Sequence, residues 1–454
     1  MEFIDSDITS YLRVADNVEH TRLVENLKAY GIEVERHAQI PYAYEIKKGK
    51  DKAGRTMEFT IGKYYIQSLS SMIPPYVLNP SGEDVVLDLS AAPGSKTTQL
   101  SQLMNNRGTL VANDPNLNRV KALAHNIDKM NCANVGILKI KGELLSKYTD
   151  EVFDKALVDA PCSALGILQK KGEVSGWWNE KQVERIAYLQ IKLLISAIKT
   201  LKVGGEIVYS TCTLTLEENE LVINTILKKY PVELVEISLP VESVEGFTEY
   251  EGMKLNPEIS KTRRIIPWQV NSEGFFIAKL RKTGETEPKE KFKLPERELK
   301  LMNFTDKKIK KYLENISSHF GIAGNVLGNY KYLIKNRDVF IVNRNWESPL
   351  LNLMIRTGIP FAFIDKRDNA QLHTHGAQLL NGEITENIVW LTSAEQLQNY
   401  FSGSSFSASE LSNGQKAVKF KDYMLGVGVA NEGKLKSQFP RSKRTHDVII
   451  PPFP

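Results

Sequence analysis

The sequence predicts an α/β protein organised around a doubly wound, mostly parallel sheet, and two observations support this prediction. Between about residues 80 and 280, short apolar runs alternate with helical stretches, as expected for strands buried on both faces between helices. In addition, Cys162 and Cys212, two of only three cysteines, stand just after two of these runs. Doubly wound folds hold their chemistry at the carboxyl ends of parallel strands. The runs lie at 85–89, 110–114, 136–140, 156–159 and 206–209.

The length and composition indicate a globular protein of more than one domain. A chain of 454 residues is too long for one core and predicts about two to four domains. No apolar run reaches the roughly 20 residues that span a bilayer, and the N-terminus lacks the pattern of a signal peptide. We therefore expect a cytoplasmic protein without membrane contact. The net charge of +5 is compatible with a polyanionic partner and with many others.

The first predicted unit, residues 1–77, is a small α+β module. A strand-like run at 11–14 precedes a helix over 21–30, which ends at Gly31. Glycines and lysines at 47–55 indicate a hairpin turn between further short strands.

The second predicted unit, residues 78–283, holds the doubly wound pattern. Its longest helix covers 181–201, shows one apolar stripe and ends at Gly204-Gly205. Two later strand-like segments, 232–237 and 275–280, predict an antiparallel hairpin that completes the sheet.

The remainder of the chain begins with a predicted linker at 284–302, which is rich in Lys and Glu and holds two prolines. The third unit, residues 303–454, starts with an amphipathic stretch at 305–335. A strand-like run at 339–342 and a β-rich end with glycines at 424–433 follow.

The first candidate site is the glycine-containing turn from Asp88 to Thr98, between a strand and a helix. Glycine lets a ligand approach the backbone closely, and the helix that follows offers unpaired N–H groups. A nucleotide P-loop is excluded because Ser95, not glycine, precedes Lys96. Asp114 ends the next strand, 26 residues after Asp88, where doubly wound folds bind ribose hydroxyls. Each motif alone fits an ordinary βα turn, but together they predict an adenosine-containing cofactor.

The cysteines form the second candidate site. Cys162 follows Asp159 in Asp-Ala-Pro-Cys, and Cys212 precedes Thr215-Leu-Glu-Glu218, which predicts a capping box at a helix start. A nearby helix N-terminus favours the thiolate. Cys132 fits a small buried hydrophobe. The spacings contain no Cys-x-x-Cys pattern, and none of the seven histidines has the context of a protease partner, so zinc, disulfides and protease chemistry are not favoured.

A basic cluster, residues 434–444, carries five positive charges, no acids and one aromatic residue, Phe439. Contact with phosphate groups and a flexible solvated tail are both compatible with this composition.

These motifs resemble, in order and spacing, the Sun/Fmu (NSUN-type) family of RNA cytosine-C5 methyltransferases, over about residues 10–280. The matching segments are 65–71, 88–98, 159–163, 209–213 with Glu217-Glu218-Asn219, and 264–267 with 274–276. The C-terminal third resembles the RNA-binding extension of the RsmF branch at 423–428, 433–436 and 440–441. The resemblance implies a Rossmann-like class I methyltransferase sheet at 78–283, an RRM-like module at 1–77 and a PUA-like module at the end of 303–454.

The resemblance also implies a divided role for the two thiols. Carbon 5 of cytosine takes a methyl group only after a nucleophile adds at carbon 6, and Cys212 matches the family's nucleophile. Cys162 would assist removal of the C5 proton and release of the product. Asp159 would contact ring N3, and Lys96 would lie near the carbonyl side of the base.

The cofactor implied by the resemblance is S-adenosylmethionine. The family's pattern places Asp114 and Arg119 at the ribose hydroxyls and an acid, usually Asp, at the adenine edge. Glu143 is our candidate for that acid. The remaining predicted cofactor contacts are Ala91, Ala92, Pro93, Gly94, Ser95, Lys96 and Asp159.

The expected function is methylation of carbon 5 of cytosine in RNA by a monomeric enzyme that needs no metal. The RsmF-like features favour 16S rRNA or the small ribosomal subunit as the substrate. Two alternatives stay open: the same reaction on tRNA, and a non-catalytic RNA-binding assembly factor.

Overall fold

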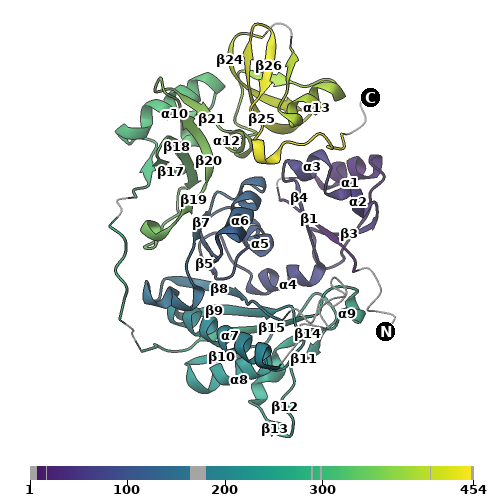
Figure 1. The fold of residues 1–454 in the computed structure, drawn as a ribbon, viewed down its shortest axis with the longest axis vertical. Coiled ribbons are helices and arrows are strands. Elements are labelled where there is room, and N and C mark those ends of the chain that lie inside the picture. The colour runs from purple at the N-terminus through teal and green to yellow at the C-terminus, as the bar shows by residue number, and fades with distance from the viewer. Residues whose placement is uncertain are drawn as a thin grey trace.

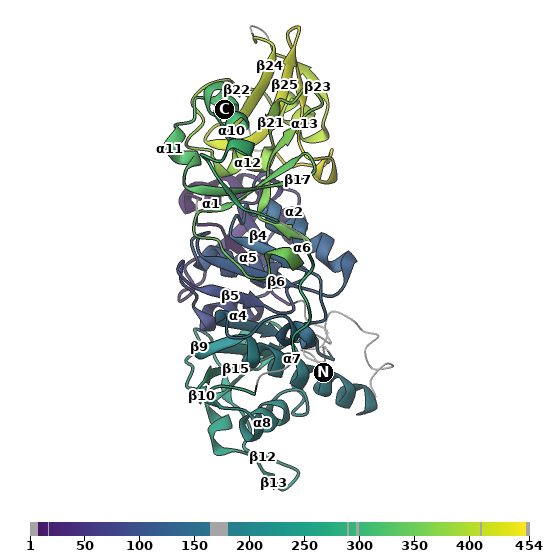
Figure 2. The same cartoon turned by 90° about the vertical axis from the view of Figure 1, so that its left-hand side faces the viewer.

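The computed structural model describes residues 8–16, 18–163, 180–287, 290–296, 299–408 and 411–450. Three units are visible in the ribbon (Figure 1). The central α/β unit occupies the lower part of the molecule, and the N-terminal and C-terminal units lie at its upper end (Figures 1 and 2). Within the described ranges, no helix is long and apolar enough to cross a membrane.

The central sheet confirms the doubly wound prediction. Its strands follow the order β11-β14-β15-β9-β8-β5-β6-β7-β19, and the five strands from β9 to β7 are parallel. The chain runs outward from β5 through β6 to β7 and then returns to β8 on the other side of β5. The carboxyl ends of β5 and β8 therefore form the topological switch point, where such sheets bind ligands. The five strands are β5 (Val85–Asp88), β6 (Thr109–Asn113), β7 (Val135–Leu138), β8 (Phe153–Asp159) and β9 (Leu201–Thr211).

Helices cover both faces of this sheet. In α6, Val120, Leu123 and Ile127 recur on one buried face, and the Asn116 side chain caps the first turn by accepting hydrogen bonds from the backbone N–H groups of residues 118 and 119. The helices are α4 (Leu69–Leu78), α5 (Ser95–Leu103), α6 (Leu117–Lys129), the 3₁₀ helix η1 (Gly142–Lys147), α7 (Glu180–Thr200), α8 (Glu220–Lys229) and α9 (Pro267–Val270).

Gly204 and Gly205 do not end the long helix as predicted. The helix α7 ends at Thr200, and both glycines lie inside β9, where the register against β8 shifts so that Lys155 pairs with Glu206. Gly204 has a φ of 85°, and a Cβ on Gly205 would lie 2.7 Å from the Asp154 carbonyl oxygen. The glycines therefore permit an irregular strand start rather than a helix stop.

The late strands complete the sheet, although not as a hairpin. β15 (Phe275–Lys282) pairs antiparallel with both β9 and β10 (Val232–Val235). Several short elements separate β10 from β15 in the sequence: β11 (Val244–Glu245), β12 (Glu249–Tyr250), β13 (Met253–Lys254), the 3₁₀ helix η4 (Pro257–Lys261) and β14 (Arg263–Ile265).

The N-terminal unit is an antiparallel sheet in the order β2-β3-β1-β4. The hairpin predicted at 47–55 is wrong. A short helix, α2, begins there instead, because Gly49 at a φ of 78° turns the chain where a Cβ would lie 2.6 Å from the Gly31 carbonyl oxygen. The elements are β1 (Tyr11–Val14), α1 (His20–Ala29), β2 (Glu33–Arg36), β3 (Ala43–Lys48), α2 (Lys50–Ala53), α3 (Met57–Thr60) and β4 (Tyr64–Gln67).

The C-terminal unit contains two five-stranded sheets. The first sheet is formed by β16 (Met302–Asn303), β17 (Tyr330–Lys335), β18 (Asp338–Asn343), β20 (Ile359–Ile364) and β21 (Ala370–Leu372). The second is formed by β22 (Ile388–Trp390), β23 (Ser405–Ser407), β24 (Gly414–Phe420), β25 (Tyr423–Asn431) and β26 (Lys434–Ser437). Helices α10 (Lys307–Phe320), α11 (Gly324–Leu327), α12 (Thr374–Leu379) and α13 (Ala394–Ser402) accompany them, with 3₁₀ helices η5 (Leu351–Leu353) and η6 (Arg441–Lys443).

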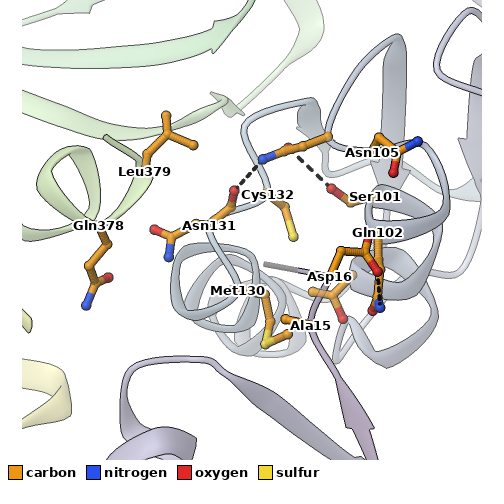
Figure 3. Close-up of a pocket in the computed structure, with 12 residues that line it drawn as sticks. Ala15, Asp16, Ser101, Gln102, Asn105, Met130, Asn131, Cys132, Gln378 and Leu379 are labelled. Atoms are coloured by element: carbon orange, nitrogen blue, oxygen red, sulfur yellow. Dashed lines mark hydrogen bonds between the residues drawn. The ribbon is translucent and has the colours of Figure 1, made fainter. Parts of the chain in front are cut away.

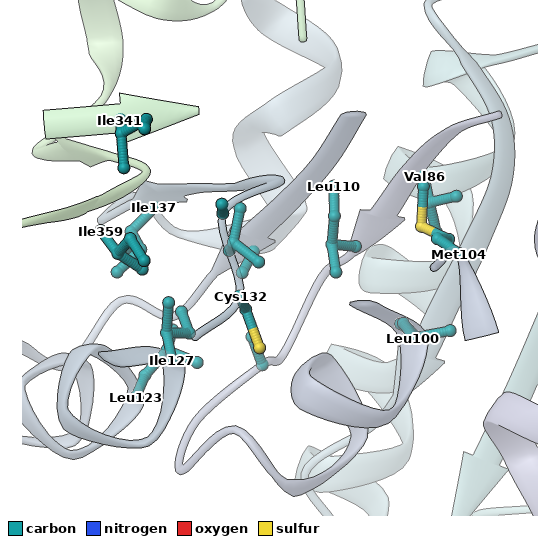
Figure 4. Close-up of a cluster of buried hydrophobic side chains, with 14 of the residues drawn as sticks. Val86, Leu100, Met104, Leu110, Leu123, Ile127, Cys132, Ile137, Ile341 and Ile359 are labelled. Atoms are coloured by element: carbon teal, nitrogen blue, oxygen red, sulfur yellow. The ribbon is translucent and has the colours of Figure 1, made fainter. Parts of the chain in front are cut away.

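The C-terminal unit packs directly on the central sheet. β19 (Arg356–Thr357) extends that sheet by pairing with β7. Ile341 and Ile359 share a hydrophobic cluster with Ile137 of β7 (Figure 4). The buried Trp346 donates from its indole nitrogen to the Asn134 carbonyl oxygen at 3.0 Å. The two units therefore share one core across this contact.

The N-terminal unit is held by Arg13, which is fully buried. Its guanidinium donates to Gln67 Oε1 at 3.2 Å and to Thr98 Oγ1 of α5 at 2.6 Å. A pocket of about 240 Å³ lies beside this contact. Residues of all three units meet there, among them Asp16, Gln102 and Gln378 (Figure 3).

The shared core predicts that Trp346→Ala destabilises the whole protein. Removing a fully buried indole costs about 3–5 kcal/mol of the free energy of unfolding. Urea titration followed by circular dichroism measures this. Trp390→Ala is the matched control, because that side chain is 52% exposed and its loss should change the free energy by about 0.5 kcal/mol or less. Equal effects of the two substitutions would contradict the shared core.

Candidate active site

The two predicted thiols meet at the carboxyl ends of neighbouring strands. β8 and β9 are parallel, and Asp159 stands opposite Ser210 in their register. Because each cysteine follows its strand by a few residues, this pairing brings Cys162 and Cys212 together, with 2.7 Å between their Sγ atoms. Neither cysteine is part of a disulfide, and both are partly exposed. Two thiols can therefore act on one bound group.

Asp159 and Lys96 form an ion pair beside the thiols. The Lys96 ammonium donates to Asp159 Oδ2 at 2.7 Å and to Ser71 Oγ at 3.0 Å, and Ser210 Oγ donates to Asp159 Oδ1 at 2.7 Å. Burial lowers the pKa of Lys96, but the neighbouring Asp159 carboxylate and Cys212 raise it, so that the pKa lies above its usual value. The pair thus keeps a positive charge next to Cys212.

Glu218 fixes the Cys162 loop, a role that the sequence analysis missed. Its buried carboxylate accepts hydrogen bonds from the Ser163 backbone N–H at 3.0 Å, from Ser163 Oγ and from Gln190 Nε2 at 2.9 Å. Thr215 Oγ1 donates to it as well, at 3.1 Å. The predicted capping box is therefore wrong: α8 begins at Glu220, and Glu218 binds a distant loop instead of capping the helix.

Asn219 and Glu220 fix the Cys212 side. Asn219 Oδ1 accepts from Thr211 Oγ1 at 2.6 Å, and its Nδ2 donates to the Thr213 carbonyl oxygen at 3.0 Å, so the amide holds the residues on both sides of Cys212. Glu220 forms a buried ion pair with Arg264, which in turn donates to the Leu214 carbonyl oxygen at 2.9 Å. The sequence signal for these roles was the run Glu217-Glu218-Asn219 just after Cys212.

The glycine turn after β5 leads into α5 as predicted. Gly94 has a φ of 110° and precedes the helix without any side-chain cap. A Cβ at this position would lie 3.0 Å from Leu123 Cδ1, which explains the glycine. Asp88 is fully buried, and Thr97 Oγ1 donates to its Oδ2 at 2.6 Å. Burial raises the pKa of Asp88 to about 7, against the lowering effect of the Thr97 hydrogen bond.

Asp114 and Arg119 lie at the end of the next strand. Asp114 Oδ1 accepts from the Asn116 backbone N–H, and Oδ2 lies 3.0 Å from Arg119 Nη1. Arg119 also donates to the Ala92 carbonyl oxygen, which ties this strand end to the glycine turn. Glu143 is partly exposed in the first turn of η1, after β7. The predicted cofactor residues therefore lie at the carboxyl ends of three adjacent strands.

Two carboxylate oxygens fit a nucleoside cofactor at this edge. Asp88 Oδ1 and Asp114 Oδ2 are buried, and in the described residues neither accepts a hydrogen bond of good geometry, although Arg119 Nη1 lies 3.0 Å from Asp114 Oδ2 as an ion-pair partner. A buried acceptor without a donor is costly, so a ligand that donates hydroxyl or amino hydrogens would satisfy both. Ribose hydroxyls supply such donors. In the same described ranges, no group of three or more His, Cys, Asp or Glu is placed to hold a metal ion.

Cys132 lies in the hydrophobic core of the central unit, as predicted. Burial raises the pKa of its thiol to about 11, so it is not a reactive thiolate. It is shown among apolar side chains in Figure 4.

Comparison with known proteins identifies the family. A family model described as 16S rRNA methyltransferase RsmB/F matches residues 75–281. A ribosomal RNA small subunit methyltransferase F of Shewanella piezotolerans is 31% identical over 413 residues, which cover 88% of this chain and 83% of that protein. A tRNA (cytosine(49)-C(5))-methyltransferase of Pyrococcus abyssi is 39% identical over 239 residues, which cover 53% of this chain and 76% of that protein.

The fold agrees with these relatives. The crystal structure of NSun6 from Pyrococcus horikoshii with SFG matches with a TM-score of 0.54 and 25% sequence identity, covering 63% of this chain and 93% of that one. The resemblance stated from the sequence is confirmed, together with its Rossmann-like methyltransferase sheet and its cofactor. The chain belongs to the RsmB/F family of S-adenosylmethionine-dependent RNA cytosine-C5 methyltransferases.

Proposed function

We propose that the protein methylates carbon 5 of a cytosine in 16S rRNA, with Cys212 as the nucleophile and Cys162 as the group that releases the product. The observation that carries this proposal is the pair of thiols 2.7 Å apart beside the Asp159–Lys96 ion pair. The choice of 16S rRNA rests on the small subunit methyltransferase F relative, which is similar over 88% of the chain.

The reaction begins with a new bond between Cys212 Sγ and carbon 6 of the base. The electrons of the C5–C6 double bond then move onto carbon 5 and into the ring toward N3 and O2. Asp159 and Lys96 stabilise this charge, because the ion pair can pass its proton to N3 as the charge develops. When bound, S-adenosylmethionine supplies the methyl group as an electrophile for carbon 5.

Cys162 acts in the second half of the reaction. Its sulfur lies against that of Cys212 and so near the same edge of the base. It assists removal of the C5 proton, and the electrons of the C5–H bond restore the C5–C6 double bond. The Cys212–C6 bond breaks at the same time, its electrons leave with the sulfur as the Cys212 thiolate, and N3 returns its proton to the ion pair. Without Cys162, the adduct of protein and RNA would persist.

The cofactor would be held at the ends of β5, β6 and β7. We propose that Asp114, oriented by Arg119, accepts the ribose hydrogen bonds, since its buried Oδ2 pairs with the Arg119 cation but accepts no hydrogen bond of good geometry from a described residue. Glu143 would contact the adenine edge. The backbone of the turn before α5 would face the methionine and ribose regions through Ala91, Ala92, Pro93, Gly94 and Ser95, with Lys96 and Asp159 beside the methyl group.

We further propose that residues 1–77 and 303–454 are RNA-binding modules on either side of a catalytic unit at 78–283 and a linker at 284–302. The four-stranded antiparallel N-terminal sheet supports an RRM-like module. The β-rich sheet from β22 to β26 supports a PUA-like module at the C-terminal end. The enzyme would act as a cytoplasmic monomer.

A tRNA substrate is the second candidate, because the Pyrococcus abyssi relative has the higher identity, 39% over 239 residues. That match covers 53% of this chain, against 88% for the small subunit methyltransferase F relative, which favours 16S rRNA. A non-catalytic assembly factor does not account for two adjacent thiols.

Bisulfite sequencing tests the substrate. RNA from cells with and without the protein should differ at a cytosine of 16S rRNA, and purified protein should restore the modification. Cys212→Ala protein is the control and should not restore it. A cytosine modified only in tRNA would contradict the choice of 16S rRNA and leave the reaction intact.

The divided mechanism predicts opposite outcomes for the two cysteines. Cys212→Ala should lower methyl transfer by at least about a thousandfold, because no adduct forms at carbon 6. Cys162→Ala should instead accumulate protein bound covalently to RNA, seen as a slower band in denaturing electrophoresis. Cys132→Ala is the matched control and should do neither. Full activity of Cys212→Ala would overturn the assignment.

The position of Glu218 predicts that it orients the Cys162 loop without touching the substrate. Glu218→Ala should lower kcat by about a hundredfold, because small displacements of reacting groups are costly. The KM for RNA and the affinity for S-adenosylmethionine should stay near the wild-type values. Glu218→Gln keeps an oxygen that can accept from the Ser163 N–H and should restore part of the rate. A change in KM alone would show that this role is wrong.

A further inference from the structure

A cationic pocket lies where the three units meet, on the side of the C-terminal segment. It has a volume of about 390 Å³. The N-terminal unit contributes residues 54–55 and 59–60, helix α6 contributes His125, Asn126 and Lys129, and the C-terminal segment 442–447 contributes the rest of the wall. Figure 1 shows this yellow segment beside α3. The pocket is separate from the thiols and from the strand ends described above.

The pocket carries more positive than negative charge. Its lining contains four cationic side chains and one carboxylate, Asp447. The cations are Arg55, Lys129, Lys443 and Arg444. Arg55 lies 3.8 Å from Asp51, whereas neither lysine forms an ion pair with any residue that the structure describes. An anion in the pocket would therefore meet several charges that the protein itself leaves uncompensated.

Of the two lysines, Lys129 is buried and Lys443 is half-buried. The Lys129 ammonium lies 3.6 Å from the centre of the Phe59 ring, and the Lys443 ammonium lies 3.3 Å from His375 Nε2. Burial lowers the pKa of Lys129 to about 8 and that of Lys443 to about 7. Keeping a lysine in such a place costs stability unless a partner compensates its charge. A bound anion is such a partner.

The wall of the pocket is firmly held. Ile449 donates from its backbone N–H to the Arg55 carbonyl oxygen at 2.8 Å and accepts from the Met57 N–H at 3.1 Å. Arg444 Nε donates to the Phe439 carbonyl oxygen at 3.0 Å, and the Thr445 N–H donates to that of Phe401 at 3.2 Å. The charges of Lys443 and Arg444 are therefore presented on a fixed backbone and not on a loose tail.

The residues of the basic cluster at 434–444 lie in different environments. Lys434 and Lys436 are exposed on β26, whereas Phe439 is buried between Tyr400 and Phe401 and cannot stack on a base. The interleaved aromatic residue is thus part of the core, and the flexible-tail alternative does not hold at 441–444.

The pocket adjoins the cofactor turn through Asn126. This residue lines the pocket and donates from Nδ2 to the Pro93 carbonyl oxygen at 2.9 Å and to Tyr65 Oη at 3.3 Å. A group bound in the pocket would therefore lie one side chain away from the turn that precedes α5.

We propose that this pocket binds a backbone phosphate group of the RNA substrate. The proposal deepens the proposed function and rests on RNA being the substrate. Several cations from different units around one cavity suit the oxygens of a phosphate, which accept hydrogen bonds in several directions. One phosphate held there would fix the RNA against all three units at once.

The test is the binding of a fluorescein-labelled single-stranded oligoribonucleotide, measured by anisotropy over a range of KCl concentrations. Lys443→Met and Lys129→Met should each weaken binding about threefold to tenfold and reduce the slope of log affinity against log salt by about 0.7. Lys443→Arg keeps the charge and should keep the slope. Lys254→Met is the matched control, since Lys254 is exposed on β13 at the opposite end of the molecule, and it should behave as wild type.

Three further measurements make the outcome decisive. Calorimetric binding of S-adenosylmethionine, unchanged in each variant, shows that the protein is folded. The proposal would be overturned if Lys443→Met and Lys129→Met both had the same RNA affinity and the same salt slope as the control Lys254→Met. The proposal would also be overturned if inorganic phosphate raised the Tm of wild type but not that of Lys443→Met, while the RNA affinity of Lys443→Met stayed at the wild-type value. The pocket would then be assigned to free phosphate. Failure of 16S rRNA methylation by the wild type would instead contradict the proposed function, because the binding measurement does not depend on it.

Discussion

The structure depends on one parallel strand pairing, that of β8 with β9. The register that sets Asp159 opposite Ser210 decides which residues leave the sheet together. A shift of one residue would turn each side chain to the other face and separate the groups that now meet. Cys162 and Cys212 are 50 residues apart in the sequence, yet their distance is fixed by backbone hydrogen bonds between two buried strands. Lys96 then reaches Asp159 from the neighbouring β5 unit, so the site is assembled from three strand ends.

The residues around the start of α8 stabilise the two loops that follow β8 and β9. Three consecutive side chains act on three different segments: Glu218 on Ser163, Asn219 on the residues around Cys212, and Glu220 on Arg264. All three are buried, and an unpaired carboxylate there would be strongly unfavourable. Their hydrogen bonds therefore both satisfy the buried charges and leave each cysteine loop little freedom. Loss of one partner would affect the opposite loop as well.

The strands, the cysteines and the acids at strand ends were predictable from the sequence, because apolar runs and motif spacing are local signals. The predictions that were wrong concern residues whose conformation is set by contacts with residues far away in the sequence. Thr215 and Glu218 have the spacing of a capping box, but the carboxylate finds better donors at Ser163, 55 residues away. Gly49 fits a hairpin, yet its turn leads into α2 because the chain packs closely against Gly31. Phe439 has the composition of an RNA contact, and only the fold shows that it is buried.

The N-terminal unit is coupled to the catalytic unit through the same helices that carry the cofactor turn. Arg13 of β1 donates to Thr98 in the first turn of α5, and Tyr65 of β4 accepts from Asn126, which also donates to the Pro93 carbonyl oxygen. The Arg13 guanidinium is buried, and burial lowers its pKa to about 10, so its hydrogen bonds to α5 are what compensate its charge. Movement of the N-terminal sheet would therefore expose an unsatisfied cation and displace the turn before α5. If the outer units hold RNA as proposed, the RNA would therefore act on the geometry of the cofactor site through packed side chains and not through a flexible linker.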